Sequence, residues 1–326
     1  MKEYFRLYVE GVGHPAPLEP ALKYEDWNDK HVLNDNNWKD HLGNSLWGMD
    51  ELKSPYWFLE YKRFFTEKLN SLGIDLLIET YLPQLVDGLI GAALHPLIHV
   101  GWGLYFENNE MVVDGLAYIC FAYVNIKHKL KSPHSKTPSE ILREVKEDSL
   151  FDSARVDGGF QPTIHNITNN LPVILKINEY AKSFKLQKDS NPKDLLYDFT
   201  IMLTELFYAT KCEDFFILHG VTAIFGLYSI LPKLSNKNQF KLLKSYWLMC
   251  VTVYIAQGRP PLVREATDIP MDFKDWKTLK AETIKSQDEH KVKITFVCRQ
   301  FSKFYPQHNQ LFFNVAYETL HSKWTF

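Results

Sequence analysis

The segment GAALHPLIHVGWGLYF, residues 91–106, is apolar and rich in small residues, yet it contains two histidines, His95 and His99. Residues four apart on a helix lie on one face, one turn from each other. Two imidazoles at this spacing can bind one transition-metal ion. Two core histidines that hydrogen-bond to backbone or to a carboxylate would give the same pattern. The segment therefore predicts a core helix with a candidate metal-binding or acid–base pair.

Pro96 lies between the two histidines and has no backbone N–H. In a continuous helix it would leave the carbonyl of Ala92 without its usual partner. Distorted helices often occur at functional sites. Gly91 before the pair, and Gly101 and Gly103 after it, allow a neighbouring helix to approach closely. We therefore expect a kinked helix that packs tightly against another.

Helical patterns dominate the rest of the chain. Apolar residues recur at helical spacing, and the alternation typical of strands is nearly absent. We predict an all-α fold, a multi-helical single large domain with long loops and little or no strand. The expected parts are an irregular N-terminal segment, 1–50, packed on a helical domain, 51–326. The expected helices are 54–73, 75–106 (kinked or divided at its prolines), 110–130, 168–186, 194–211, 214–231, 238–257, 273–285, 287–304 and 309–321, with loops at 131–139 and 151–163.

The composition excludes several classes of function. A net charge of −2 and a pI of about 6.6 give no electrostatic case for nucleic acid or an anionic membrane as a partner. The four cysteines lie far apart without a CxxC pair, so neither a zinc site nor a disulfide framework is indicated. No secretory signal or membrane span is evident. We expect a soluble cytoplasmic protein whose 14% aromatic residues form a large core, some of them lining an apolar pocket.

Two further apolar helices contain candidate ligands. His219 is a single histidine in DFFILHGVTAIFGL, a pattern more often found for a hydrogen-bonded core residue. Ser286 and Glu289 have the spacing of a capping box, which predicts a helix start near residue 287. His290 and Lys293 then share one face. A buried lysine pairs with an anion, loses its proton or is modified, and a carbamate formed with CO2 would give a metal-binding oxygen; on a solvated face it would be an ordinary surface residue.

The stretch YIAQGRP, residues 254–260, supplies two more candidates. Tyr254 and Arg259 could bind a phenolate or carboxyl oxygen of a substrate. A helix that ends at Gly258, with an arginine near its C-terminal dipole, explains the same residues equally well.

With these segments in view, the chain resembles the questin oxidase-like family, which includes fungal aromatic-polyketide oxygenases and bacterial relatives. GAALHPLIHVGWGLYF is similar to the family's most distinctive motif, GALxHPLIHxGYGLEF. The resemblance spans roughly residues 35–305. The other similar stretches are NNWKDHLGNSLWGMDELKSPYWFLEYKRFF, DFFILHGVTAIFGL, VYIAQGRPPL and DEHKVKITF.

The resemblance implies a non-haem iron held by histidines and a carboxylated lysine. By position, it implies His95, His99 or both, together with His219 and His290, as imidazole ligands of Fe(II), and Lys293 as the carboxylated ligand. Such a ligand set suits Fe(II) and leaves positions open for O2. The implied function is an oxidoreductase that oxygenates a hydrophobic aromatic or polyketide-like small molecule.

The sequence departs from the family pattern at three points. Tyr105 stands where the family has glutamate, Glu289 stands where it has glycine, and the family's N-terminal HNH segment has no equivalent beyond His14. Two alternatives stay open. One is a metal-free Baeyer–Villiger-type oxygenase with NADPH as reductant and His95 and His99 as acid–base groups, although no dinucleotide-binding fingerprint is visible. The other is a non-catalytic helical binding protein that has lost part of the ligand set.

Overall fold

The computed structural model describes residues 32–43, 54–128, 135–184, 191–265 and 275–324. In this part of the chain every named element is a helix, and the extended pairings are two isolated bridges, Leu89–Val124 and Lys136–Phe184. The predicted all-α fold with little or no strand is therefore confirmed. Most of the predicted N-terminal segment, 1–50, lies outside the described residues, so the boundary at residue 50 stays a prediction.

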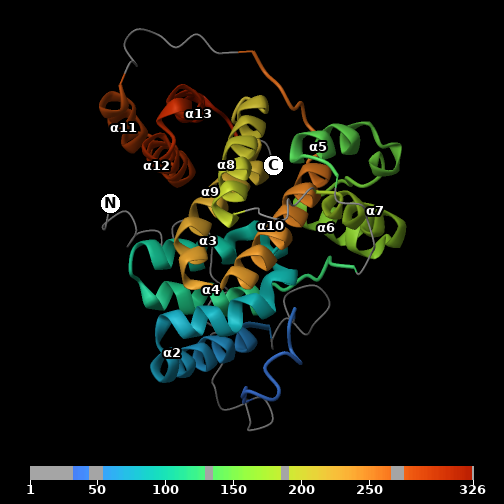
Figure 1. Cartoon of the computed structure of the whole chain (residues 1–326), viewed down its shortest axis with the longest axis vertical. Helices are drawn as coiled ribbons and strands as arrows, with labels where there is room; N and C mark the ends of the chain where they lie inside the picture. The colour runs from blue at the N-terminus through green and yellow to red at the C-terminus, as the bar shows by residue number, and fades with distance from the viewer. Residues whose placement is uncertain (1–31, 44–53, 129–134, 185–190, 266–274, 325–326) are drawn as a thin grey trace. The chain divides into compact units, whose positions relative to one another are not determined.

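The chain divides into two compact units. Residues 1–125 and 229–238 form the first unit, and residues 126–228 and 239–326 form the second. The helices of the first unit are α2 (Ser54–Leu85), α3 (His95–Tyr105) and α4 (Asn109–Phe121), with the short 3₁₀ turns η3 (Val86–Gly88), η4 (Gly91–Leu94) and η6 (Leu231–Lys233) (Figure 1). Helix α4 packs against both α2 and α3.

Most of the second unit is helical as well. Its helices are α5 (Pro138–Glu147), α6 (Phe160–Asn169), α7 (Leu171–Lys182), α8 (Pro192–Ala209), most of α9 (Phe215–Ile230) and α10 (Asn236–Ala256), α11 (Trp276–Lys285), α12 (Glu289–Phe304) and α13 (Asn309–His321), with the 3₁₀ turns η5 (Ser149–Phe151) and η8 (Pro306–His308). Within this unit α12 packs against α11 and α13.

Helix α2 shows how one residue interrupts a helical pattern. The predicted helix end at Gly73 corresponds to a break in backbone geometry, because Gly73 has φ 73° and ψ 167°. Helical geometry resumes after it and continues through Pro83 to Leu85. A glycine adopts this left-handed φ without the penalty that a Cβ atom imposes.

The predicted interruption of the helical run at Pro96 is a division and not a kink, because α3 begins at His95 and places Pro96 in its first turn. In the first turn a missing N–H breaks no intrahelical hydrogen bond. The carbonyl of Ala92 does have partners, since it accepts from the backbone N–H of His95 and lies 2.7 Å from His95 Nδ1. Three consecutive residues before the helix, Ala92, Ala93 and Leu94, have positive φ values of 48°, 53° and 66°. The chain therefore turns sharply just before the histidine pair.

Two helices were not predicted. Helix α5 starts at Pro138 after a complete capping box, in which Thr137 and Glu140 satisfy each other's backbone N–H groups. Helix α6, Phe160–Asn169, begins inside the expected loop 151–163, and the predicted helix 168–186 corresponds to α7, Leu171–Lys182. The predicted helix 110–130 ends earlier, at Phe121. Only a narrow apolar stripe of α5 is buried, so its sequence reads as a polar linker.

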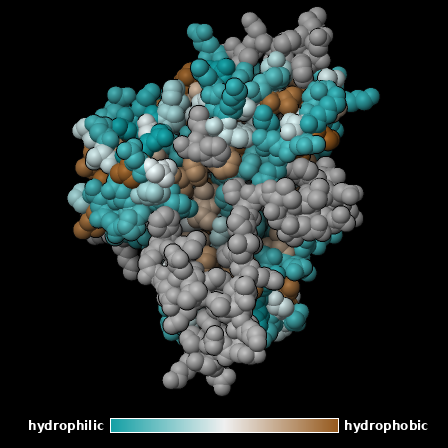
Figure 2. Space-filling model, turned by 180° about the vertical axis from the view of Figure 1, so that it is seen from behind, coloured by the Kyte–Doolittle hydropathy of each residue, from teal (hydrophilic) through white to brown (hydrophobic). Residues whose placement is uncertain are grey.

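One apolar helical stretch dominates the core of the described chain. The run Phe215–Lys233 is long and apolar enough to cross a membrane, but 78% of its apolar window is buried inside the structure. This burial is typical of a core helix in a soluble protein. On the face in Figure 2 the described residues are mainly hydrophilic, with hydrophobic residues interspersed. Large exposed apolar side chains such as Leu76, Leu171 and Val263 belong to different elements.

Glycines set the separation of α3 and α4. A Cβ atom built on Gly115 would lie 2.7 Å from the backbone nitrogen of Val100 and 3.0 Å from the carbonyl oxygen of Pro96. A Cβ atom on Gly103 would lie 2.9 Å from the backbone nitrogen of Val112. These contacts are with backbone, which cannot move aside as a side chain can. The predicted close approach of another helix to this segment is confirmed.

The substitution Gly115→Ala is expected to destabilise the first unit. The added methyl must push α4 away from α3, which costs about 1–3 kcal/mol of unfolding free energy. Gly220→Ala in α9 is the matched control, because its Cβ would meet Leu203 at an ordinary 3.7 Å. Alanine is the better helix former, so Gly220→Ala should leave stability unchanged or raise it slightly. Thermal melts of the two variants test this, and equal melting temperatures would contradict the packing argument.

Candidate functional site

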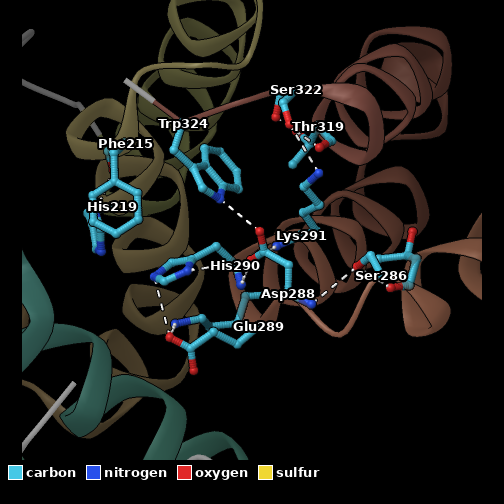
Figure 3. Close-up of polar contacts among 12 residues, drawn as sticks. Phe215, His219, Ser286, Asp288, Glu289, His290, Lys291, Thr319, Ser322 and Trp324 are labelled. Carbon is cyan, nitrogen blue, oxygen red and sulfur yellow. Dashed lines mark hydrogen bonds and ion pairs between the residues drawn. The ribbon is translucent and has the colours of Figure 1, made fainter. Parts of the chain in front are cut away.

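Two predicted ligands come together in the second unit, His219 on α9 and His290 on α12 (Figure 3). Their ring centroids lie 5.8 Å apart with an interplanar angle of 68°. Phe215, one turn before His219, contacts both imidazoles at centroid distances of 4.7 and 4.6 Å. Both histidines are buried, His219 with 1% and His290 with 8% of its surface exposed. We call His219, His290, Glu289 and Lys293 the polar cluster.

Asp288 fixes the start of α12. Its Oδ1 atom accepts hydrogen bonds from the backbone N–H groups of His290 at 2.9 Å and Lys291 at 3.4 Å. The predicted capping box of Ser286 and Glu289 is wrong, and the helix starts at Glu289 instead of near residue 287. Ser286 follows the last turn of α11, where its hydroxyl donates to a carbonyl of that helix. Asp288 takes the capping role because its short carboxylate directly precedes the first helical turn.

The end of α13 and the residues after it form hydrogen bonds with the first turn of α12. Trp324 Nε1 donates to Asp288 Oδ2 at 2.8 Å. Lys291 Nζ donates to the carbonyl oxygens of Leu320 and Ser322 at 2.9 and 3.1 Å, at the end of α13. Figure 3 shows these contacts around His290. The cluster therefore depends on residues from three separate stretches of the second unit.

Backbone carbonyls determine which nitrogen of two histidines carries the proton. His219 Nδ1 lies 2.6 Å from the carbonyl oxygen of Phe215, and His95 Nδ1 lies 2.7 Å from that of Ala92. A carbonyl oxygen only accepts, so Nδ1 is the donor in each ring. In the neutral ring Nε2 then has the lone pair. Metal-binding histidines are commonly oriented in this way by a carbonyl.

Glu289 links the imidazole of His290 to the amine of Lys293. Its Oε1 atom lies 3.5 Å from His290 Nε2 and 3.7 Å from Lys293 Nζ, both beyond a normal hydrogen-bond length. This oxygen is buried, and no group of the described residues lies within hydrogen-bonding distance of it. A buried carboxylate oxygen in this condition retains the capacity to bind a cation.

Burial changes the protonation of both basic groups. It lowers the pKa of Lys293 to about 8, although the charge of Glu289 acts in the opposite direction. Burial also lowers the pKa of His290, and the neighbouring charge of Lys293 lowers it further, against the raising effect of Asp288 and Glu289. At neutral pH His290 is therefore a neutral imidazole. A fraction of Lys293 is the neutral amine, the form that reacts with electrophiles.

His95 and His99 belong to the first unit. His95 is buried at the start of α3, and His99 is half-buried one turn later, with its ring centroid 6.1 Å from that of Tyr118 on α4. The predicted helical spacing of the pair is confirmed by α3. That these imidazoles share a centre with the polar cluster stays a prediction.

Tyr254 and Arg259 have contacts that fit the end of a helix. The hydroxyl of buried Tyr254 donates to the carbonyl of Pro260 at 3.0 Å. The guanidinium of Arg259 donates to two backbone carbonyls at the end of α5, at 3.0 and 2.8 Å, and pairs with Asp152. A cation at these carbonyls compensates the helix dipole. Their role in binding substrate stays a prediction.

The donor types in the cluster fit iron. Imidazole nitrogen and carboxylate oxygen are ligands that Fe(II) accepts, and the buried Glu289 oxygen lies beside an imidazole. Across the described residues, no group of three His, Cys, Asp or Glu side chains is arranged to hold a metal ion. A third ligand would have to come from Lys293, in modified form, or from a change of side-chain position.

Sequence reasoning missed the residues that support the predicted ligands. Asp288, Phe215 and Trp324 contact the cluster, but nothing in their local sequence marks them as functional. The sequence marks Glu289 as a capping-box partner of Ser286 and as a departure from a family glycine, not as a member of the cluster. The signal that could have found it is its spacing, because residue 289 precedes Lys293 by one helical turn and can pair with it.

The fold and the cluster define a helical protein that buries imidazole, carboxylate and amine groups together. A model of the Questin oxidase-like family matches residues 4–298 of the 326, and the chain belongs to this family. The match covers the whole polar cluster and ends before Trp324. A comparison with curated proteins gives no match.

The charge of Asp288 is expected to contribute to stability in a pH-dependent way. Burial raises its pKa, but hydrogen bonds from His290 and Trp324 more than offset this, so the pKa lies well below its usual value. A depressed carboxyl pKa stabilises the folded state above the unfolded pKa of about 4, and the effect is lost as pH falls below that value. Asp288→Asn, which keeps a capping oxygen, should lower the unfolding free energy by about 1 kcal/mol at pH 7.

Thermal melts between pH 3 and pH 7 measure this effect. The difference between wild type and Asp288→Asn should shrink as the pH falls. Asp275→Asn is the matched control, because Asp275 caps α11 in the same way but is exposed and lacks a tryptophan partner. A loss at Asp288 no larger than that at Asp275, or one that does not change with pH, would refute the assigned role.

The amine of Lys293 is expected to titrate near pH 8. Selective ¹³C labelling of lysine side chains and an NMR titration of the Cε resonances would show one lysine well below the surface lysines, which titrate near about 10.4. Glu289→Gln should lower this pKa further, because it removes the nearby negative charge. Glu282→Gln on exposed α11 is the control. A Lys293 pKa that is normal, or insensitive to Glu289, would contradict the cluster geometry.

Proposed function

We propose that the protein is an oxidoreductase that uses O2 to oxygenate an aromatic or polyketide-like small molecule in the cytoplasm. Membership of the Questin oxidase-like family supports oxygenase chemistry. The observation that carries the proposal is the burial of two imidazoles beside a carboxylate oxygen that has no hydrogen-bond donor at normal distance. A buried polar atom without a hydrogen bond lowers the stability of the folded protein, and such atoms are commonly found at functional sites.

His219 and His290 would hold Fe(II) in this proposal, each from a different helix. Bound iron would supply the redox chemistry and an open position for O2. The carbonyl of Phe215 orients His219, and the capping contact of Asp288 positions the backbone that carries His290. The rings of Phe215 and Trp324 pack against the imidazole of His290 and would shield it from solvent.

The anionic ligand would come from the pair of Glu289 and Lys293. In a carbamate, the neutral amine nitrogen of Lys293 forms a bond to the carbon of CO2 and loses a proton, and the product bears one negative charge. The low pKa of Lys293 favours this reaction. A carbamate next to the Glu289 carboxylate would repel it, because two buried anions destabilise each other. The carbamate and the carboxylate are therefore alternative sources of the same oxygen ligand.

His95 and His99 complete the proposal as additional ligands or as acid–base groups toward the substrate. The carbonyl of Ala92 leaves the Nε2 lone pair of His95 as the atom that would bind or accept a proton. Tyr254 and Arg259 are proposed to contact an oxygen of the substrate only if their helix-end contacts open.

Iron content tests the proposal directly. Protein purified without chelators should contain iron close to one equivalent per chain, and His219→Ala or His290→Ala should lose most of it, because each removes one imidazole ligand. His321→Ala is the matched control, since His321 is exposed at the end of α13 and contacts a backbone carbonyl. Loss of iron in Lys293→Met but not in Glu289→Gln would identify the carbamate, and the reverse would identify Glu289.

The remaining outcomes separate the alternatives. O2 uptake that requires NADPH and survives chelation would replace iron chemistry with a metal-free Baeyer–Villiger-type reaction. Retention of a hydrophobic ligand without O2 uptake, in protein free of iron, would make the chain a binding protein. The latter is favoured by one observation, that the described residues contain no ready three-ligand metal site of His, Cys, Asp or Glu side chains.

A further inference from the structure

Residues 322–324 follow α13 and bring Trp324 to the polar cluster (Figure 3). The chain leaves the helix at Ser322, whose backbone is extended, with φ −70° and ψ 158°. The indole of Trp324 contacts the imidazole of His290 and the ring of Phe215, each at a centroid distance of 6.0 Å. We call residues 322–324 the C-terminal strap.

Two side chains at the start of α12 hold the strap in place. Asp288 Oδ2 accepts the hydrogen bond of the Trp324 indole at 2.8 Å. Lys291 Nζ donates to the backbone carbonyl of Ser322 at 3.1 Å and to that of Leu320 at 2.9 Å. Hydrogen bonds that involve a charged group are stronger than those between neutral groups. The position of the strap therefore depends on a small number of strong contacts.

The strap is held less firmly than the helices beside it. His219 and His290 lie on α9 and α12, whose backbones are held by helical hydrogen bonds. The strap is not helical, and Lys323 in its middle is exposed. Segments with few buried contacts open locally at a free energy well below that of global unfolding. The strap can therefore move away from His290 while both helices stay folded.

A solute can reach His290 only if part of its surroundings moves, because the residue is 8% exposed and its imidazole lies against Phe215 and Trp324. We propose that the C-terminal strap is a gate, which opens when Trp324 leaves Asp288 and then admits small solutes to His290. The gate would regulate the site of the proposed function and in that sense rests on it. Its test requires neither iron nor O2.

Acylation of the His290 imidazole by diethyl pyrocarbonate, a small neutral reagent, tests the gate. The reaction is followed by peptide mass spectrometry on the full chain, with a chelator present so that no metal protects the ring. In the wild type His290 should react much more slowly than exposed His321. The rate should follow the population of the open strap, provided that opening and closing are fast relative to acylation.

Lys291→Met is the decisive variant. Adjacent residues on a helix do not face each other, so this change leaves the wall around His290 intact and removes only an anchor of the strap. It should raise the acylation rate of His290 about tenfold, the usual effect of losing a hydrogen bond to a charged group. Lys303→Met is the matched control, because Lys303 also lies on α12 but is exposed and donates to the side chain of Gln300.

Variants of Trp324 test the other anchor. Trp324→Phe keeps a ring beside His290 but removes the hydrogen bond to Asp288, so the rate should rise severalfold. Trp324→Ala removes both the bond and the cover, and should give the largest increase.

The thiol of Cys298 distinguishes opening of the strap from unfolding. Cys298 lies on α12 and is 0% exposed, so its alkylation by iodoacetamide reports on loss of the helix packing. This rate should stay unchanged in Lys291→Met and Trp324→Phe. The proposal is overturned if wild-type His290 reacts as fast as His321, if Lys291→Met reacts at the wild-type rate, or if Cys298 and His290 accelerate together. A protein without iron or O2 uptake would refute the proposed function and leave these rates unaffected.

Discussion

The contact on which the polar cluster depends most is the capping of α12 by Asp288. One carboxylate accepts hydrogen bonds from two backbone N–H groups and from the indole of Trp324. These bonds fix where the helix begins and therefore the direction in which Glu289, His290 and Lys293 project. Without a defined first turn, the imidazole of His290 would have no fixed relation to His219 on α9. A structural interaction at the helix end thus sets the geometry of the chemical groups.

His290 and Lys293 are buried, and burial lowers the pKa of both groups. Lys293 is 8% exposed, and Oε1 of Glu289 lies 3.7 Å from its Nζ atom, a distance too long for a strong hydrogen bond. Burial destabilises the charged ammonium form relative to the neutral amine, and this explains the low pKa of Lys293. The carboxylate in turn is short of donors. Lys293 is therefore closer to losing its proton than an exposed lysine is.

The sequence predicted the ends of the apolar helix α9 well and missed the polar helix α5. α9 and α13 were found within one or two residues of their observed ends, because a continuous apolar face specifies where a core helix runs. α5 was missed because only a few of its residues are buried. The start of α12 was misplaced because Ser286 and Asp288 both have the chemistry of a cap, and only the path of the chain after α11 selects between them.

The candidate site was predictable in its ligands but not in its supports. His219, His290 and Lys293 stood out because each is a titratable residue in an apolar helix. Phe215, Trp324 and the Lys291 contact with the end of α13 arise from tertiary packing, which no local pattern encodes. Glu289 was expected in a capping box, and its place between His290 Nε2 and Lys293 Nζ follows only from the structure.

The attachment of the last residues to the start of α12 has a practical consequence for anyone who shortens this chain. A fragment cut where the family similarity stops, after residue 298, would keep every proposed ligand yet lose the last turns of α12, all of α13 and Trp324, which hydrogen-bonds to the start of α12. The minimal autonomous fragment is thus longer than the similarity indicates.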